Sequence, residues 1–271
     1  MVRTAFADLP AEVRAELADL AGPVKEFIPA LVGNHADVAG QMRTSRGRAF
    51  IKGARLQPGQ RGGGAEAWSL GNEAGVLAAV RPHAPELLWT FDLAGWRIVG
   101  FEFVDGRHAD YTPGSPDLDL VAAAVEDLAE RECPPSVKLR VQDRYAALDD
   151  RAEVFGGTSL VHCDLNPENV LITADGAVRI VDWAFASRGA PWLDFGFMVP
   201  WLLRAGHSPE SAESWLAGYP LWKGADTGHV DLFAGLLDRT WTRRNVEGAP
   251  AWLVEYAGLV RTWREGRSSS L

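Results

Sequence analysis

The chain has 271 residues, of which 36 are acidic and 27 basic, so its formal net charge is −9. With 47% hydrophobic and 23% charged residues it has the composition of an ordinary globular protein, long enough for one large core or for two lobes. The negative charge argues against nucleic acid and anionic membranes as partners, whereas a cationic small molecule would be attracted.

The cysteines and the N-terminal residues further limit which class of protein the chain can belong to. Cys133 and Cys163 are the only cysteines, and neither belongs to a Cys-x-x-Cys motif or a histidine cluster. This argues against a disulfide framework and against a structural zinc site. The N-terminal residues are charged throughout and contain no apolar run typical of a signal peptide or a membrane span. We therefore expect a cytoplasmic protein.

The first hundred residues predict a helix followed by strands. Residues 8–20 have the spacing of an amphipathic helix, with Asp8 as its N-cap. Apolar runs separated by turn residues then predict three strands, at 24–32, 38–44 and 48–54. Lys52 lies on the third of them.

A glycine-rich connection at 57–64 leads into a predicted helix over 65–80. Two more strand-like runs follow, at 87–91 and 96–104. This order of elements indicates a small antiparallel sheet with one helix packed on it. We assign residues 1–104 to a first lobe.

The remaining chain, residues 105–271, is predicted to be mainly helical and forms a second lobe. Ser115 as N-cap and Pro116 at the first helical position predict one helix, and Ser136 opens another whose apolar residues keep helical spacing. The pair Asp175-Gly176 between two apolar runs predicts a β-hairpin. Prolines separate the helices that we expect after this hairpin.

One stretch concentrates side chains suited to chemistry. His162-Cys163-Asp164 is followed by Asn169 and, after the hairpin, by Val181-Asp182-Trp183. Phosphoryl transfer requires a group that orients the attacking hydroxyl and hard oxygen ligands that hold Mg²⁺. An Asp, an Asn and a second Asp within one loop-and-hairpin unit meet this requirement.

These motifs resemble those of the aminoglycoside phosphotransferase and choline kinase family, the small-molecule branch of the protein-kinase-like fold. Lys52 on a strand, Glu73 on the following helix and residues 101–106 as a linker occur in the order of that family. The resemblance covers roughly residues 24–200. It implies a bilobal α+β fold, with a nucleotide-binding first lobe and a larger, mainly helical catalytic and substrate-binding lobe.

The resemblance implies roles for five residues of the second lobe. Asp164 would accept a hydrogen bond from the substrate hydroxyl and act as the catalytic base, while Asn169 and Asp182 would ligate Mg²⁺. His162 would brace the loop beside the metal-binding Asp rather than transfer protons. Asp194 would stabilise the catalytic loop.

In the first lobe, Lys52 would reach the nucleotide phosphates and be held in place by Glu73. A lysine that faces a cleft without a partner is costly, so a carboxylate partner is also expected on physical grounds. Glu66, seven positions earlier on nearly the same helical face, is the rival partner. The turn that contains Gly33 and Asn34 stands in place of a glycine-rich phosphate loop.

In the linker between the lobes, Glu102 and Val104 are further expected nucleotide contacts. The implied cofactors are ATP and Mg²⁺, with GTP left open as the donor. The implied substrate is a hydroxylated small molecule, and the negative charge of the chain would favour a cationic one: an aminoglycoside or nucleoside antibiotic, or a related metabolite. Both a monomer and a homodimer are compatible with the sequence.

Several departures from the kinase pattern limit the interpretation. The absence of Gly-x-Gly-x-x-Gly and Ala-Pro-Glu motifs, and Asp182-Trp183-Ala184 in place of Asp-Phe-Gly, argue against a protein kinase. Cys163 stands where this branch generally has glycine. The chain ends without an acidic segment, which argues against an aminoglycoside. A pseudokinase, which binds nucleotide without turnover, remains the alternative, although all the expected catalytic residues are present.

Overall fold

The computed structural model describes residues 3–30 and 36–268, which divide into two compact units. Unit 1 contains the chain up to Asp105 together with Val181–Phe185, and unit 2 contains Gly106–Ile180 and Ala186–Leu271. The predicted α+β class is confirmed, because unit 1 has a five-stranded antiparallel sheet and unit 2 is rich in helices. Sequence order alone places Val181–Phe185 with the second lobe, yet this segment is part of unit 1.

Unit 1 is built on one antiparallel sheet with the strand order β1-β2-β3-β5-β4. Its strands are β1 (Val24–Pro29), β2 (Val38–Thr44), β3 (Arg48–Arg55), β4 (Leu87–Leu93) and β5 (Trp96–Glu102). The chain leaves β3 through a helix, forms β4 at the sheet edge and returns as β5 beside β3. All five predicted strands are present, and the predicted turn at Gly33 and Asn34 lies outside the described residues.

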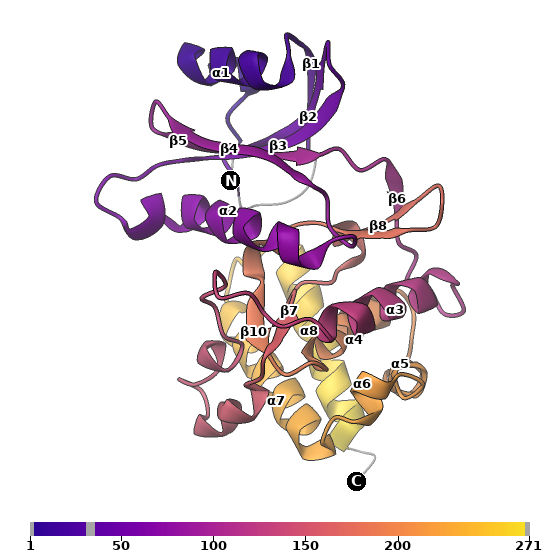
Figure 1. Cartoon of the computed structure of the whole chain (residues 1–271). Helices are drawn as coiled ribbons and strands as arrows, with labels where there is room; N and C mark the ends of the chain where they lie inside the picture. The colour runs from indigo at the N-terminus through magenta and orange to yellow at the C-terminus, as the bar shows by residue number, and fades with distance from the viewer. Residues whose placement is uncertain (1–2, 31–35, 269–271) are drawn as a thin grey trace. The chain divides into compact units, whose positions relative to one another are not determined.

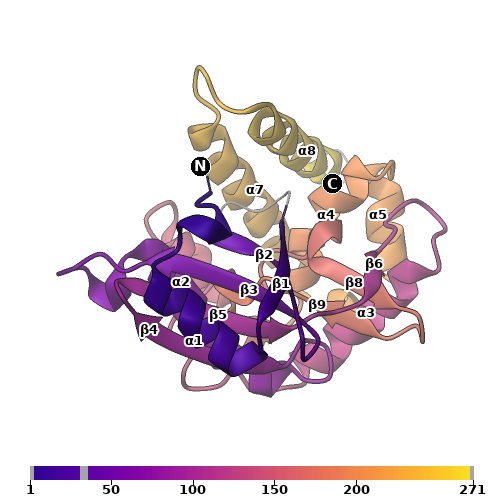
Figure 2. The same ribbon diagram turned by 90° about the horizontal axis from the view of Figure 1, so that it is seen from above.

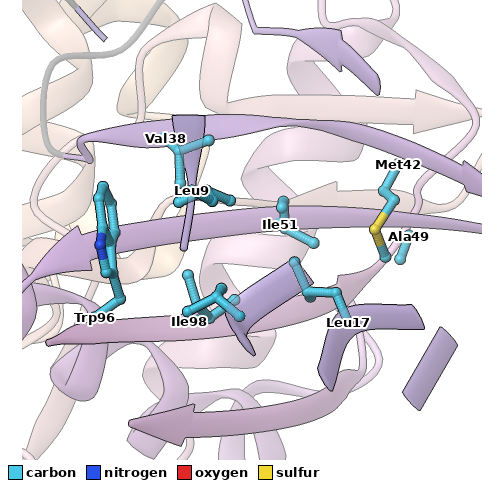
Figure 3. Packing of buried hydrophobic residues seen from close by; sticks show 9 residues of the cluster. Leu9, Leu17, Val38, Met42, Ala49, Ile51, Trp96 and Ile98 are labelled. Atoms are coloured by element: carbon cyan, nitrogen blue, oxygen red, sulfur yellow. The ribbon is translucent and has the colours of Figure 1, made fainter. Parts of the chain in front are cut away.

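One face of this sheet is covered by α1 (Ala11–Ala21). Leu17 of the helix and Leu9 just before it pack with Val38 and Ile51 of the sheet in an apolar cluster (Figure 3). Fully burying one such side chain stabilises the fold by about 1.5–3 kcal/mol. The predicted helix is therefore confirmed as the cover of this face.

The predicted N-cap of that helix is wrong. Asp8 ends a short 3₁₀ turn, η1 (Phe6–Asp8), in which its backbone N–H donates to the Ala5 carbonyl at 2.9 Å. Because this turn already uses Asp8, α1 begins only after Pro10, with no side-chain cap.

The opposite face of the sheet contacts α2 (Ala65–Val76), which follows the 3₁₀ turn η2 (Arg61–Gly63). The helix predicted over 65–80 is present, but its last turn tightens into the 3₁₀ helix η3 (Leu77–Val80). Successive side chains of a strand point to opposite faces. Because Ile51 faces α1, Lys52 points toward α2 on the other side of the sheet.

Unit 2 contains two small antiparallel sheets. A three-stranded sheet has the order β6-β8-β9, and a two-stranded sheet pairs β10 with β7. These strands are β6 (Gly106–His108), β7 (Ser159–Val161), β8 (Val170–Thr173), β9 (Val178–Ile180) and β10 (Ser187–Gly189). The predicted hairpin is confirmed between β8 and β9, where the turn uses Gly176 at a φ of 82°.

Six α-helices are described in unit 2: α3 (Asp117–Ala129), α4 (Leu193–Arg204), α5 (Pro209–Leu216), α6 (Pro220–Lys223), α7 (Thr227–Arg244) and α8 (Ala251–Ser268). Helices α7 and α8 lie side by side, and α4 packs against α8 (Figures 1 and 2). Phe233 of α7 lies in the core of this unit, with its ring edge-on to those of Phe155, Trp192 and Phe197. Among the described helices, none is both long and apolar enough to cross a membrane.

Two helix predictions in this unit need correction. Helix α3 begins at Asp117, one residue later than predicted, although the Ser115 hydroxyl still accepts from the Asp117 N–H at 3.3 Å. The α-helix predicted from Ser136 is wrong. There the backbone of residues 139–141 bonds to Arg188, as donor at 2.9 Å and as acceptor at 2.8 Å, so only a 3₁₀ turn, η4 (Gln142–Arg144), forms.

Candidate active site

Lys52 lies at the centre of three charged groups in unit 1, which we call the ion triad. Its ammonium nitrogen is 2.9 Å from each carboxylate oxygen of Glu73 and 2.8 Å from Oδ1 of Asp182. Strand β3 presents the lysine, and the glutamate lies in the second half of α2, where it is 3% exposed. Lys52 thus pairs with Glu73, as predicted, and not with the rival Glu66.

The triad keeps its lysine charged. Burial alone would lower the pKa of Lys52, but the carboxylates of Glu73 and Asp182 outweigh this effect and raise the pKa above its ordinary value. Burial raises the pKa of Glu73, and the Lys52 ammonium opposes that rise. Because two carboxylates face one ammonium, the ionised triad carries an excess negative charge, which a further cation would balance.

A short structured segment holds Asp182 against Lys52. Asp182 has a left-handed backbone with a φ of 62° and is followed by the 3₁₀ turn η7 (Trp183–Phe185). This turn packs on α2, where the Asn72 side chain donates to the Ala184 carbonyl at 3.0 Å, and Trp183 is buried. The carboxylate is therefore placed by the contacts of the whole segment.

In unit 2, the loop after β7 surrounds Asp164 with amide donors. Asn166 donates to Oδ1 of Asp164 at 3.1 Å, and Asn169 donates to Oδ2 at 3.1 Å and to the Asp164 carbonyl at 2.9 Å. The Asn166 oxygen also caps the 3₁₀ turn η6 (Pro167–Asn169) by accepting from the backbone N–H groups of Glu168 and Asn169. Both oxygens of the carboxylate are thus oriented by side chains of one loop.

Asp194, in the first turn of α4, holds this loop in place. The buried carboxylate of Asp194 accepts the backbone N–H groups of His162 and Cys163, each at 2.8 Å. Burial raises the pKa of Asp194 to about 6, although these two hydrogen bonds lower it. His162 is fully buried, and its Nδ1 accepts the Asp164 N–H at 3.2 Å. Both residues therefore contact the loop that presents Asp164.

Cys163 occupies an unfavourable backbone position. Its φ is 69°, in the left-handed region that favours glycine, and its side chain is buried. Burial raises the pKa of the thiol to about 12, so the group stays protonated and is no nucleophile at neutral pH. Glycine, which the motif of the similar kinases generally has at this position, would therefore suit the left-handed backbone of the loop.

The available oxygen donors suit Mg²⁺ better than a metal that needs a closed set of protein ligands. Asn169 uses its nitrogen toward Asp164, and within the part of the chain described no donor reaches its Oδ1. In unit 1, taken by itself, Asp182 offers a carboxylate beside the Lys52 ammonium. No cluster of three or more His, Cys, Asp or Glu side chains able to hold a metal occurs among the described residues. Mg²⁺ is usually bound by one or two protein oxygens, with water and substrate phosphates completing its shell.

Comparison with known proteins connects this geometry with a chemistry. Residues 115–227 match the model of the phosphotransferase enzyme family, a range that includes Asp164, Asn169, Asp182 and Asp194. Over this range the chain is similar to phosphotransferases. The resemblance inferred from the sequence motifs is thereby confirmed. No curated protein matches the chain.

Solved structures extend the likeness to nearly the whole chain. A choline kinase from Streptococcus pneumoniae is 15% identical with a TM-score of 0.65, and the match covers 94% of this chain and 98% of that chain. An aminoglycoside phosphotransferase from Alicyclobacillus acidocaldarius subsp. acidocaldarius is 13% identical, with a TM-score of 0.63 and coverage of 98% and 95%. An AMP-bound spectinomycin phosphotransferase is 12% identical, with a TM-score of 0.61 and coverage of 93% and 97%. At these identities the likeness shows the bilobal fold of small-molecule kinases.

Four residues were predicted to contact nucleotide, and the two that the structure describes, Glu102 and Val104, make none of the contacts of the ion triad. Gly33 and Asn34 lie outside the described residues. Glu102 ends β5 and exchanges hydrogen bonds with the backbone of Glu86, and Val104 follows it, half-buried. Their role toward nucleotide stays a prediction.

Two asparagines that the sequence analysis missed support the site. Asn166 orients Asp164, and Asn72 holds the segment that follows Asp182. Asn166 directly before Pro167 has the pattern of an N-cap followed by proline, which could have indicated its capping role. Asn72 lies within a helix and gives no such local signal.

Proposed function

We propose that this phosphotransferase uses ATP and Mg²⁺ to phosphorylate a hydroxyl group of a small molecule. The ion triad carries the proposal. A half-buried, oriented ammonium suits phosphate oxygens, and the excess carboxylate of Asp182 suits a divalent cation. The Asp164 carboxylate, oriented by two amides in unit 2, supports it.

Each residue has a defined part in the proposed reaction. Lys52 would bind the α and β phosphates while Glu73 holds its ammonium in place. Asn169 and Asp182 would ligate Mg²⁺, which offsets the charge of the phosphates when it is bound. Asp164 would accept the hydrogen bond of the substrate hydroxyl, aim its oxygen at the γ-phosphorus and take up the proton late in the step.

For the substrate we propose an antibiotic or a related hydroxylated metabolite. The aminoglycoside and spectinomycin phosphotransferases among the structures of like fold support this class. ATP is the proposed donor and GTP the alternative. Such a reaction belongs in the cytoplasm, where the free thiols of Cys133 and Cys163 would stay reduced.

Replacing the proposed base tests this function against the pseudokinase alternative. ATP consumption is first measured with a panel of aminoglycosides, nucleoside antibiotics, choline-like amines and sugars, which identifies an acceptor. We then expect Asp164→Asn to lower kcat by about 10²- to 10⁴-fold, because the hydroxyl loses its orienting base, while nucleotide affinity stays nearly unchanged.

Asp175→Asn is the matched control, since Asp175 is an exposed carboxylate at the tip of the β8–β9 hairpin. This variant should keep wild-type kcat. An Asp164→Asn enzyme with most of its activity would refute the assignment of the base. A wild-type protein that binds nucleotide and consumes none with any acceptor would favour the pseudokinase.

A further inference from the structure

Unit 2 contains a pocket that none of the residues with a role in the proposed reaction lines. It encloses about 520 Å³, a volume typical of small-molecule sites. Its walls are the loop before α3, the first turn of α3, the link between α4 and α5, and α5 itself, which is bonded to α3 through side chains (Figure 1). We call it the α3–α5 pocket, and its polar groups come from Asp119, His207 and Ser211.

The charge of the pocket is negative. Its lining includes the carboxylate of Asp119 and neither lysine nor arginine. Oδ1 of Asp119 accepts from the Tyr219 hydroxyl at 2.5 Å and from the Trp215 indole N–H at 3.4 Å. Both donors are neutral, and from the part of the chain that the structure describes no cation and no further hydrogen bond reaches this carboxylate. A bound cation would therefore balance a charge that the fold leaves uncompensated.

His207 adds a second acceptor to the pocket. The residue is 9% exposed, and its Nε2 lies 3.0 Å from the Tyr111 carbonyl. A carbonyl oxygen only accepts, so Nε2 carries a proton and Nδ1 of the neutral ring is an acceptor. No described residue bonds to Nδ1, yet this nitrogen is not one of the fully buried polar atoms without a partner. Since His207 lines the pocket and is otherwise buried, Nδ1 is open to the pocket.

The fold holds these groups in place without a ligand. Tyr111 is 2% exposed and donates its hydroxyl to the Leu165 carbonyl at 3.2 Å, so the residue that bonds to the His207 ring is itself fixed. The rings of Trp215 and Tyr219 lie edge to face with centroids 5.0 Å apart, and both bond to Asp119. Groups that are already oriented lose little freedom when a ligand binds.

We propose that the α3–α5 pocket is a second small-molecule site and that it binds a primary ammonium ion attached to a flat apolar group. An ammonium has three N–H donors, which match in number Oδ2 of Asp119, Nδ1 of His207 and the Ser211 hydroxyl oxygen. The Ser211 hydroxyl donates to the Ser208 carbonyl at 3.1 Å, which leaves its oxygen free to accept. The Trp215 indole would contact the apolar group and attract the cation.

Other ligand classes fit the pocket less well. An anion would be repelled by the Asp119 carboxylate, because no lysine or arginine of the lining opposes that charge. A neutral alcohol would leave the same charge unbalanced. The inference goes beyond the proposed function and does not depend on it.

The test measures binding to the full-length protein without nucleotide, by titration with fluorine NMR detection at pH 7. The probe is 4-fluorobenzylamine, which is protonated at this pH and has no hydroxyl that could accept phosphate. Its neutral and anionic counterparts are 4-fluorobenzyl alcohol and 4-fluorobenzoate. We expect the amine to bind at least about five-fold more tightly than either counterpart, because hydrogen bonds between charged groups are about twice as strong as neutral ones.

Two variants assign the bound amine to the pocket. Asp119→Asn keeps the oxygen that accepts from Trp215 and Tyr219 and removes only the charge, so it should weaken the binding of the amine at least about five-fold while the fold stays intact. Trp215→Leu should weaken it about 2- to 10-fold through the lost contact with the ring. Circular dichroism of both variants checks that they are folded.

Asp175→Asn and Trp252→Leu are the matched controls, since both residues are exposed in unit 2 and neither lines the pocket. They should bind the amine as the wild type does. Tighter binding of the alcohol or the benzoate, wild-type binding by both pocket variants, or an equal loss in a control would overturn the inference.

Competition separates this pocket from the acceptor site of the proposed reaction. An acceptor identified by ATP consumption should leave the amine bound. If that acceptor displaces the amine, the pocket is part of the acceptor site, and the inference of a second site fails while the proposed function holds. A protein that binds the amine through Asp119 and transfers no phosphate to any acceptor refutes the proposed function alone.

Discussion

Two residues of the candidate site hold a backbone conformation that side chains rarely adopt. Asp182 and Cys163 have φ values of 62° and 69°. Asp tolerates this region because its short polar side chain can bond locally, but cysteine has no such compensation. Strain of this kind costs about 1–3 kcal/mol. At Cys163 the hydrogen bond from its N–H to Asp194 helps to hold the loop in place despite the strain.

This strain predicts an unusual order of stabilities at position 163. Replacing a residue by glycine normally destabilises more than replacing it by alanine, because glycine gains more entropy in the unfolded chain. At Cys163 we expect the Gly variant to equal or exceed the Ala variant in free energy of unfolding, by up to about 1 kcal/mol, because only glycine is unstrained at this φ. Urea denaturation of both variants measures the difference.

Cys133 is the control for this comparison, since it is also buried and is not among the described residues with a positive φ. There the alanine variant should be the more stable of the two. The same order at both positions would mean that the loop at Cys163 relaxes and stores no strain.

At the scale of elements, Asp194 joins helix α4 to the loop after β7. Its position in the first turn of the helix favours a negative charge, and its two hydrogen bonds hold the backbone before Asp164. Burial opposes the charge and raises the pKa of the carboxyl from 3.8 to about 6. The folded protein therefore binds this proton more readily than the unfolded chain does.

The sign of the pH dependence follows from that shift. The contribution of Asp194 to stability is fully present below about pH 4 and is lost as the pH rises through about 6. Relative to Asp194→Asn, which cannot titrate here, the wild-type free energy of unfolding should fall by up to about 3 kcal/mol between pH 4 and pH 7. Urea titrations at several pH values measure it.

Asp175→Asn serves as the control, because the Thr173 hydroxyl holds the pKa of Asp175 below its ordinary value. Relative to Asp175→Asn, the wild-type free energy of unfolding should be independent of pH or should rise with pH. A wild-type advantage over Asp194→Asn that grows with pH would contradict the shift.

The elements also show which features local sequence patterns can predict. The β8–β9 hairpin was predicted from Asp175-Gly176, and the pairing of Lys52 with Glu73 was implied by the resemblance to the kinase family. The segment after Ser136 has helically spaced apolar residues, and Val137, Val141 and Tyr145 are indeed buried. Its backbone nevertheless bonds to Arg188, a partner distant in sequence that no local pattern reveals.

In the candidate site, too, local sequence patterns did not reveal contacts between residues that are distant in the sequence. In the loop after β7, Asp164 and Asn169 were singled out by the resemblance of their motif, whereas the role of Asn166 in the same loop was missed. The membership of Val181–Phe185 in unit 1 was not predicted, since it depends on contacts with α2, more than a hundred residues earlier in the chain. Likewise, nothing near Asn72 in the sequence indicates its bond to Ala184.

At the scale of the whole molecule, unit 1 includes the segment Val181–Phe185, which is far from the rest of this unit in the sequence. The half-buried Lys52 and the buried Glu73 gain the Asp182 carboxylate through this segment, and the single positive charge offsets only one of the two negative charges. A ligand that brings phosphates to the ammonium and a divalent cation to the carboxylate would satisfy this unbalanced group. Ligand binding should therefore stabilise the folded chain as a whole.

Thermal denaturation with and without Mg·ATP tests this linkage. At one hundred times its Kd, a ligand that binds only the folded state stabilises it by about 2.7 kcal/mol, which should raise the Tm of a chain of this size by about 5–10 °C. Asp164→Asn should keep the shift, because Asp164 acts on the acceptor. Lys52→Met should lose most of it.

Each shift is measured against the same variant without ligand, because Lys52→Met leaves Glu73 buried without its cation and lowers stability by itself. Lys25→Met, at an exposed position on β1, is the control and should shift as the wild type does. A full shift in Lys52→Met would place the nucleotide away from the ion triad.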